Sequence, residues 1–203
     1  MSQETGQSLL PDGFIWSYWQ ATAQEIGLYS LNMIMLRAGL GRIVVAEKSL
    51  PKREPVSVAE FGHFQQALRE YYGRGARGLL TRIGRGAWRE MSQNLHIYRR
   101  IVVNFLRFLP ASIGVRLVLN NLAAFLRYSG SWMSVQGSGK DLSFVDFSGL
   151  ASFGQTAGEP VCWTMVGLIH GALESIAGKE YEIDEVSCRA AGSEACKFYI
   201  KFL

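Results

Sequence analysis

The chain has 203 residues, of which 48% are hydrophobic and 19% charged, with a formal net charge of +4. This balance fits one globular domain with a substantial core and excludes an intrinsically disordered chain. No run of about 18 consecutive apolar residues occurs, which argues against a membrane span. The polar N-terminus lacks the features of a signal peptide, so we expect a cytoplasmic protein.

Residues 1–13 are expected to form a flexible arm, with Asp12 as the N-cap of a helix over residues 14–36. This helix carries a broad apolar face, which predicts burial in the core or against a partner subunit. Gly39 and Gly41 are expected to end it. Residues 43–58 form a connector, and a second helix then begins at Val58. Ser57 and Glu60 are spaced as a capping box at its start.

Further helices are predicted over residues 79–94, 95–109 and 113–128. The Gly-rich stretch 72–78 matches neither common phosphate-binding loop, so it indicates a tight turn. Nine arginines but only two acidic residues fall between positions 69 and 107. This segment could meet nucleic acid, an anionic lipid surface or a carboxylate-bearing ligand, or it could be an ordinary solvated helix face.

The pattern changes from helical to alternating at residue 130. A β-hairpin is predicted over residues 132–147, a helix over 160–177, and two strands over 181–190 and 196–203 that turn around Gly192. The expected class is α+β, with N-terminal helices packed on a C-terminal antiparallel sheet that one helix interrupts. We expect a single domain, 1–203, with a mainly helical part over 14–129 and an α+β part over 130–203.

All three cysteines lie in the last quarter of the chain. Together with Glu185, the residues Cys162, Cys188 and Cys196 make a candidate tetrahedral zinc site. Two alternatives remain at this point. The cysteines could be small core residues with Glu185 on the surface, or Cys188 and Cys196 could form a disulfide, which a reducing compartment disfavours.

The metal hypothesis makes a structural prediction. In a regular strand, Glu185 and Cys188 point to opposite faces of the sheet, because successive side chains alternate. A β-bulge near Val186 or Ser187 would bring both to the same side, with Tyr181 facing the core as well. Four protein ligands leave no coordination position for water, so the site would be structural rather than catalytic.

The end of the chain resembles the signature of the 4-vinyl reductase domain family. The resemblance covers about residues 130–203 and is diffuse before them. It rests on a Glu, a Cys, a Gly and a second Cys followed by an aromatic residue, and on a Pro-Val-Cys-Trp start to the preceding helix with two glycines within it. In this chain these are Glu185, Cys188, Gly192, Cys196 and Phe198, and Pro160, Cys162, Trp163, Gly167 and Gly171.

The family includes the sensory domains of phenol- and xylene-responsive activators and a protein of bacteriochlorophyll synthesis. The resemblance implies a fold like that of TRAPP tethering subunits, a homodimer and an apolar pocket for an aromatic or tetrapyrrole-like ligand. It also implies zinc bound by three cysteines and one glutamate, roles that fall on Cys162, Glu185, Cys188 and Cys196. The activators' ATPase and DNA-binding modules are not expected here, and so neither is direct DNA binding.

The function we favour is a sensor or carrier of a small aromatic, hydrocarbon or tetrapyrrole-like ligand, with zinc as a structural ion. Alternatives are a tetrapyrrole vinyl reductase or its accessory protein, and a dimeric tethering module. The sequence contains no dinucleotide-binding or flavin motif that would supply a hydride, so no catalytic residue is assigned. Expected pocket residues are aromatic, with one histidine as a polar contact: His96, Tyr128, Trp132, Phe144, Phe147 and Trp163.

Overall fold

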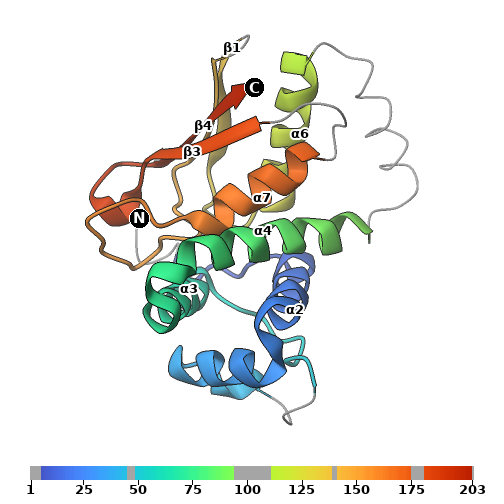
Figure 1. Ribbon diagram of the computed structural model, residues 1–203, viewed down its shortest axis with the longest axis vertical. Coiled ribbons are helices and arrows are strands. Elements are labelled where there is room, and N and C mark those ends of the chain that lie inside the picture. The colour runs from blue at the N-terminus through green and yellow to red at the C-terminus, as the bar shows by residue number, and fades with distance from the viewer. Residues whose placement is uncertain (1–5, 45–48, 94–110, 139–140, 175–180, 203) are drawn as a thin grey trace.

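The computed structural model describes residues 6–44, 49–93, 111–138, 141–174 and 181–202, which form helices and one antiparallel sheet (Figure 1). The helices are α2 (Asp12–Arg37), α3 (Val58–Tyr72), α4 (Ala76–Gln93), α6 (Ala111–Phe125) and α7 (Trp163–Glu174). The strands are β1 (Met133–Ser138), β2 (Asp141–Asp146), β3 (Tyr181–Ser187) and β4 (Cys196–Phe202). The predicted α+β class is confirmed. The helix expected over residues 95–109 lies outside the described residues.

The sheet has the strand order β1-β2-β4-β3, and every neighbouring pair is antiparallel. Helix α7 connects β2 to β3 along the chain, and it contacts β3, α6 and α4. Figure 1 shows α7 between the sheet and α4, with α2 and α3 beyond α4. Helices α2, α3 and α4 therefore lie on the far side of α7 from the sheet, whereas α6 contacts β1 and β2 directly. No helix in the described ranges is long and apolar enough to cross a membrane.

Helices α4 and α7 cross at close range because both carry glycine at the contact. A Cβ atom on Gly84 would lie 2.2 Å from the carbonyl oxygen of Thr164. One on Gly167 would lie 2.1 Å from the carbonyl oxygen of Thr81. Both distances are far inside van der Waals contact, so neither position accepts a larger residue without moving a helix. This contact fixes the first turns of α7 against α4.

Helix α2 is broken at Gly27, whose φ of 78° and ψ of 158° belong to a region that only glycine adopts readily. The sequence predicted one continuous helix here, which was wrong. The apolar pattern runs through the break, so periodicity alone gave no sign of it. After the break, Tyr29, Met33 and Leu36 leave one face of the helix exposed to solvent.

The capping box at the start of α3 is confirmed. Ser57 Oγ accepts a hydrogen bond from Glu60 N, and Glu60 Oε2 accepts one from Ser57 N at 2.8 Å. Residue Leu9 forms an isolated β-bridge with Ser57, and Leu10 N donates to the carbonyl oxygen of Val56 at 2.9 Å. The described part of the expected arm, from Gly6 onwards, therefore packs against the segment that leads into α3. Helix α2 begins at Asp12 without a side-chain cap.

A buried polar triad joins three helices. Gln65 Nε2 of α3 donates to the hydroxyl oxygen of Tyr18 of α2 at 2.8 Å. Thr164 Oγ1 of α7 donates to Gln65 Oε1 at 2.7 Å and lies 3.4 Å from the Tyr18 hydroxyl. All three side chains are at most 3% exposed. Burial raises the pKa of Tyr18 to about 12, which keeps its hydroxyl neutral.

Candidate metal centre

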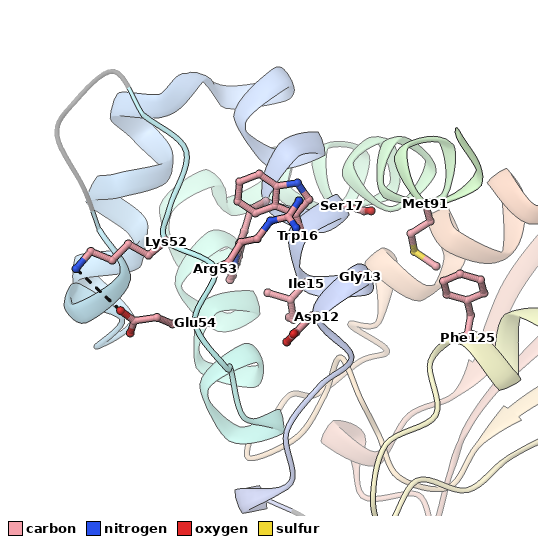
Figure 2. Close-up of a pocket in the computed structure, with 11 residues that line it drawn as sticks. Asp12, Gly13, Ile15, Trp16, Ser17, Lys52, Arg53, Glu54, Met91 and Phe125 are labelled. Atoms are coloured by element: carbon pink, nitrogen blue, oxygen red, sulfur yellow. Dashed lines mark ion pairs between the residues drawn. The ribbon is translucent and has the colours of Figure 1, made fainter. Parts of the chain in front are cut away.

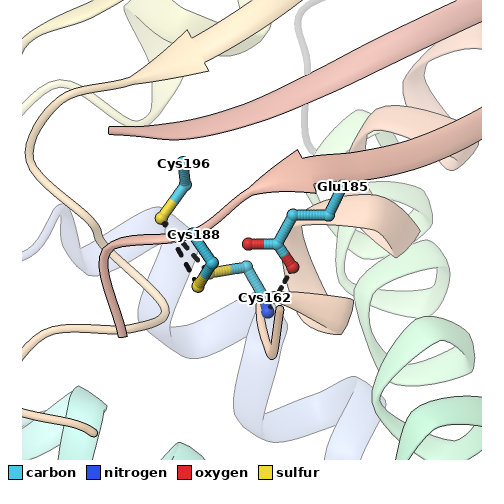
Figure 3. A group of neighbouring side chains, drawn as sticks. All are labelled: Cys162, Glu185, Cys188 and Cys196. Atoms are coloured by element: carbon cyan, nitrogen blue, oxygen red, sulfur yellow. Dashed lines mark hydrogen bonds between the residues drawn. The ribbon is translucent and has the colours of Figure 1, made fainter. Parts of the chain in front are cut away.

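The structure brings Cys162, Glu185, Cys188 and Cys196 together (Figure 3). Cys162 immediately precedes α7, Glu185 lies on β3, Cys188 follows β3, and Cys196 begins β4. Their ligand atoms all lie within 4.8 Å of one another. The sulfur atom of Cys162 is 3.7 Å from that of Cys188 and 3.5 Å from that of Cys196, and the third sulfur pair is 4.0 Å apart.

The predicted β-bulge is present. Glu185 pairs with Phe198, and the next pair along the two strands is Ser187 with Lys197. Val186 is the extra residue, and it is 56% exposed. The bulge therefore lets Glu185 and the cysteine that follows Ser187 point to the same side of the sheet.

The turn between β3 and β4 places two cysteines opposite each other. A short 3₁₀ turn follows Cys188 and ends at Gly192, whose φ of 88° is left-handed. Ser193 N then donates to the carbonyl oxygen of Cys188 at 3.1 Å and closes the turn. Arg189 N lies 3.4 Å from the sulfur of Cys196 and donates to it. The backbone thus positions the sulfur atoms and supplies a hydrogen-bond donor to that of Cys196.

Glu185 has one oxygen satisfied and one free. Its Oε2 accepts a hydrogen bond from Cys162 N at 2.8 Å. Its Oε1 is buried and has no hydrogen-bond partner among the described residues. A buried carboxylate oxygen without a partner is costly, and a cation beside three sulfur atoms would supply the missing interaction. The residues present therefore fit a metal ion.

The acid–base properties of the four side chains also fit a bound cation. Burial, together with negative charge on Cys188, raises the pKa of Glu185 to about 8. Hydrogen bonds from Cys162 and Cys196 lower the pKa of the Cys188 thiol. Donating to Cys188 raises the pKa of Cys162 well above its ordinary value. Four acidic groups this close cannot all lose their protons in a buried site unless a cation compensates their charge.

A second layer of polar groups holds Cys196. Its sulfur lies 3.2 Å from Ser152 Oγ. Across the sheet, Cys196 pairs with Asp146 of β2, a carboxylate that is 1% exposed. That carboxylate accepts hydrogen bonds from three successive backbone N–H groups, residues 148–150. These bonds shape the loop that carries Ser152 to the cluster.

All three cysteines are buried in the core, but the geometry disagrees with a disulfide and with a surface position for Glu185. All three cysteines are free, and sulfur separations of 3.5–4.0 Å are well beyond the roughly 2.05 Å of a disulfide bond. Glu185 is half-buried and hydrogen-bonded to Cys162, so it is not a surface side chain.

The expected pocket residues differ in their burial. Tyr128 and Phe144 are buried in the core. Trp132 is 65% exposed and stacks on Phe147 with ring centroids 4.4 Å apart. Trp163 is half-buried at the start of α7. His96 lies outside the described residues.

A cavity of about 420 Å³ lies elsewhere, and none of the described residues expected to form the pocket lines it (Figure 2). It is bounded by the first turns of α2, the segment 52–54, the end of α4 and the end of α6. Sequence reasoning missed it, although two tryptophans on the broad apolar face of the first helix were a signal. The lining residues are Asp12, Gly13, Ile15, Trp16, Ser17, Trp19, Lys52, Arg53, Glu54, Met91 and Phe125.

Comparison with known sequences supports the family resemblance. The model of the 4-vinyl reductase domain family matches residues 150–202, a segment that contains all four cluster residues. The predicted likeness to this family is thereby confirmed over the matched segment. An uncharacterized protein of Methanocaldococcus jannaschii is 44% identical over 43 residues, which are 21% of this chain and 24% of that protein. The chain thus matches about a quarter of that relative's length.

Comparison with solved structures finds the same fold in H-NOX proteins. One from S. oneidensis in the Fe(II) ligation state gives a TM-score of 0.57 at 13% identity, covering 94% of this chain and 95% of that one. An Fe(II) unliganded H-NOX mutant from K. algicida gives 0.58 at 12% identity, covering 95% and 96%. An H-NOX mutant from T. tengcongensis gives 0.54 at 16% identity, covering 93% and 95%. At identities this low, the structural similarity shows a common fold and nothing more.

Proposed function

We propose that this chain is a small-molecule-binding domain, a sensor or carrier, stabilised by a structural zinc ion. The ion's ligands are Cys162, Glu185, Cys188 and Cys196. The observation that carries the metal assignment is the approach of all four ligand atoms to within 4.8 Å of one another, with Glu185 Oε1 buried and unpartnered among the described residues. Three thiolates and one carboxylate form a donor set typical of tetrahedral zinc.

The ion would act as a cross-link between two parts of the fold. Zinc supplies the positive charge that lets the three thiols and the carboxyl lose their protons together. Cys162 belongs to the start of α7, and the other three ligands belong to β3, β4 and the turn between them. The site therefore joins the interior helix to the sheet. With four protein ligands and no open position, its role is structural.

Two observations support a small-molecule function. The cavity of about 420 Å³ falls within the range of roughly 300–1,000 Å³ that ligand pockets occupy. One solved structure of the same fold is described in terms of heme redox potential and porphyrin distortion, at a TM-score of 0.53 and 14% identity. We therefore propose an aromatic, hydrocarbon or tetrapyrrole-like ligand for this chain.

We further propose a cytoplasmic homodimer. A reducing compartment keeps the three thiols available to the metal. The exposed face of Tyr29, Met33 and Leu36 on the second half of α2 offers apolar surface for a second copy. Light scattering of the purified chain measures the oligomeric state directly. A monomer at all concentrations would contradict the dimer without affecting the metal or the ligand.

Elemental analysis and mass spectrometry test the main proposal. We expect about one zinc ion per purified wild-type chain, as in other four-ligand structural sites, and its loss in Cys188→Ser. Asp184→Asn, an exposed change on the same strand, should keep the metal. Native mass spectrometry of the purified protein identifies any small molecule retained. Wild-type protein without metal would refute the zinc site, and metal retained by Cys188→Ser would place it elsewhere.

A further inference from the structure

The cavity between α2, α4 and α6 has two kinds of wall. One is apolar and largely aromatic, formed by Ile15, Trp16, Trp19, Met91 and Phe125. The other is charged, and its cations come from the segment 52–54 (Figure 2). A site with flat apolar walls and a charged rim favours a ligand with a planar ring system and one ionised group.

The charges on the rim are unequally compensated. Lys52 Nζ lies 4.0 Å from Glu54, whose carboxylate also lies 3.8 Å from Arg42. Arg53 makes no ion pair with any carboxylate that the structure describes. Its guanidinium carbon lies 4.3 Å from the centre of the Trp16 ring. Stacking on an indole holds the guanidinium plane and leaves its N–H groups available at the edge, the arrangement suited to a carboxylate.

The acidic residue Asp12 does not cancel this preference. It is the first residue of α2, where the positive end of the helix dipole offsets its charge. It makes no ion pair with Arg53 within the described residues. A ligand anion at Arg53 therefore meets a cation that no described carboxylate has already engaged.

The apolar wall includes Trp19, which lines the cavity and is 1% exposed. Its Nε1 is buried and does not reach the cavity surface, so this side chain offers a ligand apolar contact rather than a hydrogen bond.

We infer that this cavity binds a planar aromatic carboxylate. The ring lies against the indole, phenyl and thioether groups, and the carboxylate accepts hydrogen bonds from Arg53. The inference rests on the proposed small-molecule function and specifies its ligand class. It adds the requirement that the ligand be an anion, which neither a phenol nor an aromatic hydrocarbon meets at neutral pH.

Calorimetric titration of the full chain with two probes of the same shape tests the charge preference. The probes are 2-naphthoate and its neutral counterpart 2-naphthalenemethanol. We expect the acid to bind at least about tenfold more tightly at pH 7 and low salt, the usual size of a charge-assisted hydrogen bond. Arg53→Gln should abolish this difference, because both probes then meet a neutral side chain. Arg74→Gln, which changes another exposed arginine, is the control that should bind both probes as the wild type does.

The possible outcomes distinguish a failure of the carboxylate preference from a failure of the proposed small-molecule function. Equal binding of acid and alcohol would overturn the carboxylate preference while keeping a small-molecule site. Naphthoate binding that Arg53→Gln leaves intact would place the anion away from this cavity and overturn the assignment. If neither probe binds, the inference is wrong. Titration with naphthalene in the same assay then decides whether a neutral ligand site remains, and its failure would count against the proposed function itself.

Discussion

The backbone N–H of Cys162 donates a 2.8 Å hydrogen bond to Oε2 of Glu185, and this bond ties the start of α7 to strand β3. It also orients the carboxylate, because it engages one oxygen and leaves Oε1 without a described partner among the sulfur atoms. Cys162 thus contributes to the cluster twice, through its sulfur atom and through its backbone. The same residue begins the helix, since the N–H groups of Met165 and Val166 donate to its carbonyl oxygen.

Neutralising the carboxylate of Glu185 should weaken metal binding. In Glu185→Gln the amide oxygen can still accept from Cys162 N, but the negative charge is lost. We expect zinc affinity, measured by competition with a chromophoric chelator, to fall at least about tenfold. The matched control is Glu182→Gln, an exposed glutamate on the same strand that pairs with Lys201. Equal affinities in the two variants would show that Glu185 is no ligand.

Changing the length of β3 should test the role of the bulge. Deleting Val186 turns β3 into a regular strand, in which Glu185 and Cys188 stand two positions apart and still face the same side. We therefore expect this deletion to retain zinc. Deleting Asp184 instead keeps the bulge but reverses the side to which Tyr181 and Ile183 point, and should abolish folding or metal binding. Metal analysis and circular dichroism measure both effects. Loss of zinc only in the Val186 deletion would contradict this geometry.

The close contact of α4 with α7 makes Gly84 a sensitive position. In Gly84→Ala the new methyl group would collide with the carbonyl oxygen of Thr164. Overpacking of this kind costs about 1–3 kcal/mol, which corresponds to a fall in Tm of roughly 2–12 °C for a chain of this size. Gly75→Ala is the control, because nothing lies within 4 Å of the added methyl group. Equal Tm values for the two variants would mean that the helices can separate freely.

The buried triad should give the protein an alkaline limit. Tyr18 has an ordinary pKa of 10.0 that burial raises to about 12, so the folded chain keeps a proton that the unfolded chain releases. The associated stability is complete below pH 10 and is lost as the pH rises towards about 12. In Tyr18→Phe this loss should disappear, although the variant should be less stable by about 1–3 kcal/mol at pH 7 because Gln65 loses a partner.

Urea unfolding at several pH values measures both effects. The control is Tyr29→Phe, which changes an exposed tyrosine on the same helix and should follow the wild-type profile. A Tyr18→Phe profile that falls as steeply as the wild type between pH 10 and 12 would assign the alkaline loss to other groups.

Much of the cluster of three cysteines and Glu185 could be predicted because it depends on local rules. Alternation along a strand determines which side chains share a face, and that rule required the bulge once Glu185 and Cys188 were placed together. The family resemblance then identified the same four residues. The Ser57–Glu60 capping box was predictable for the same reason, since its partners are three residues apart.

The cavity and the helix break could not be predicted in this way. The cavity joins segments from residues 12, 52, 91 and 125, and no local pattern records which of them will meet. None of the described aromatic residues expected to form a pocket near the hairpin lines this cavity, and Trp132 and Phe147 stack on each other. The break at Gly27 depends on how the two halves of α2 pack, which apolar periodicity does not show.

The spacing of the three sulfur atoms has a consequence for the protein's chemical durability. At 3.5–4.0 Å, each sulfur is within a small side-chain movement of two others. An oxidant could therefore join any pair and leave the third cysteine as a free thiol, since the separations of 3.5, 3.7 and 4.0 Å are similar. A bound metal would coordinate all three sulfur atoms at once. It would thus act as a protecting group, and the first sign of its loss in air would be a mixture of cross-linked isomers.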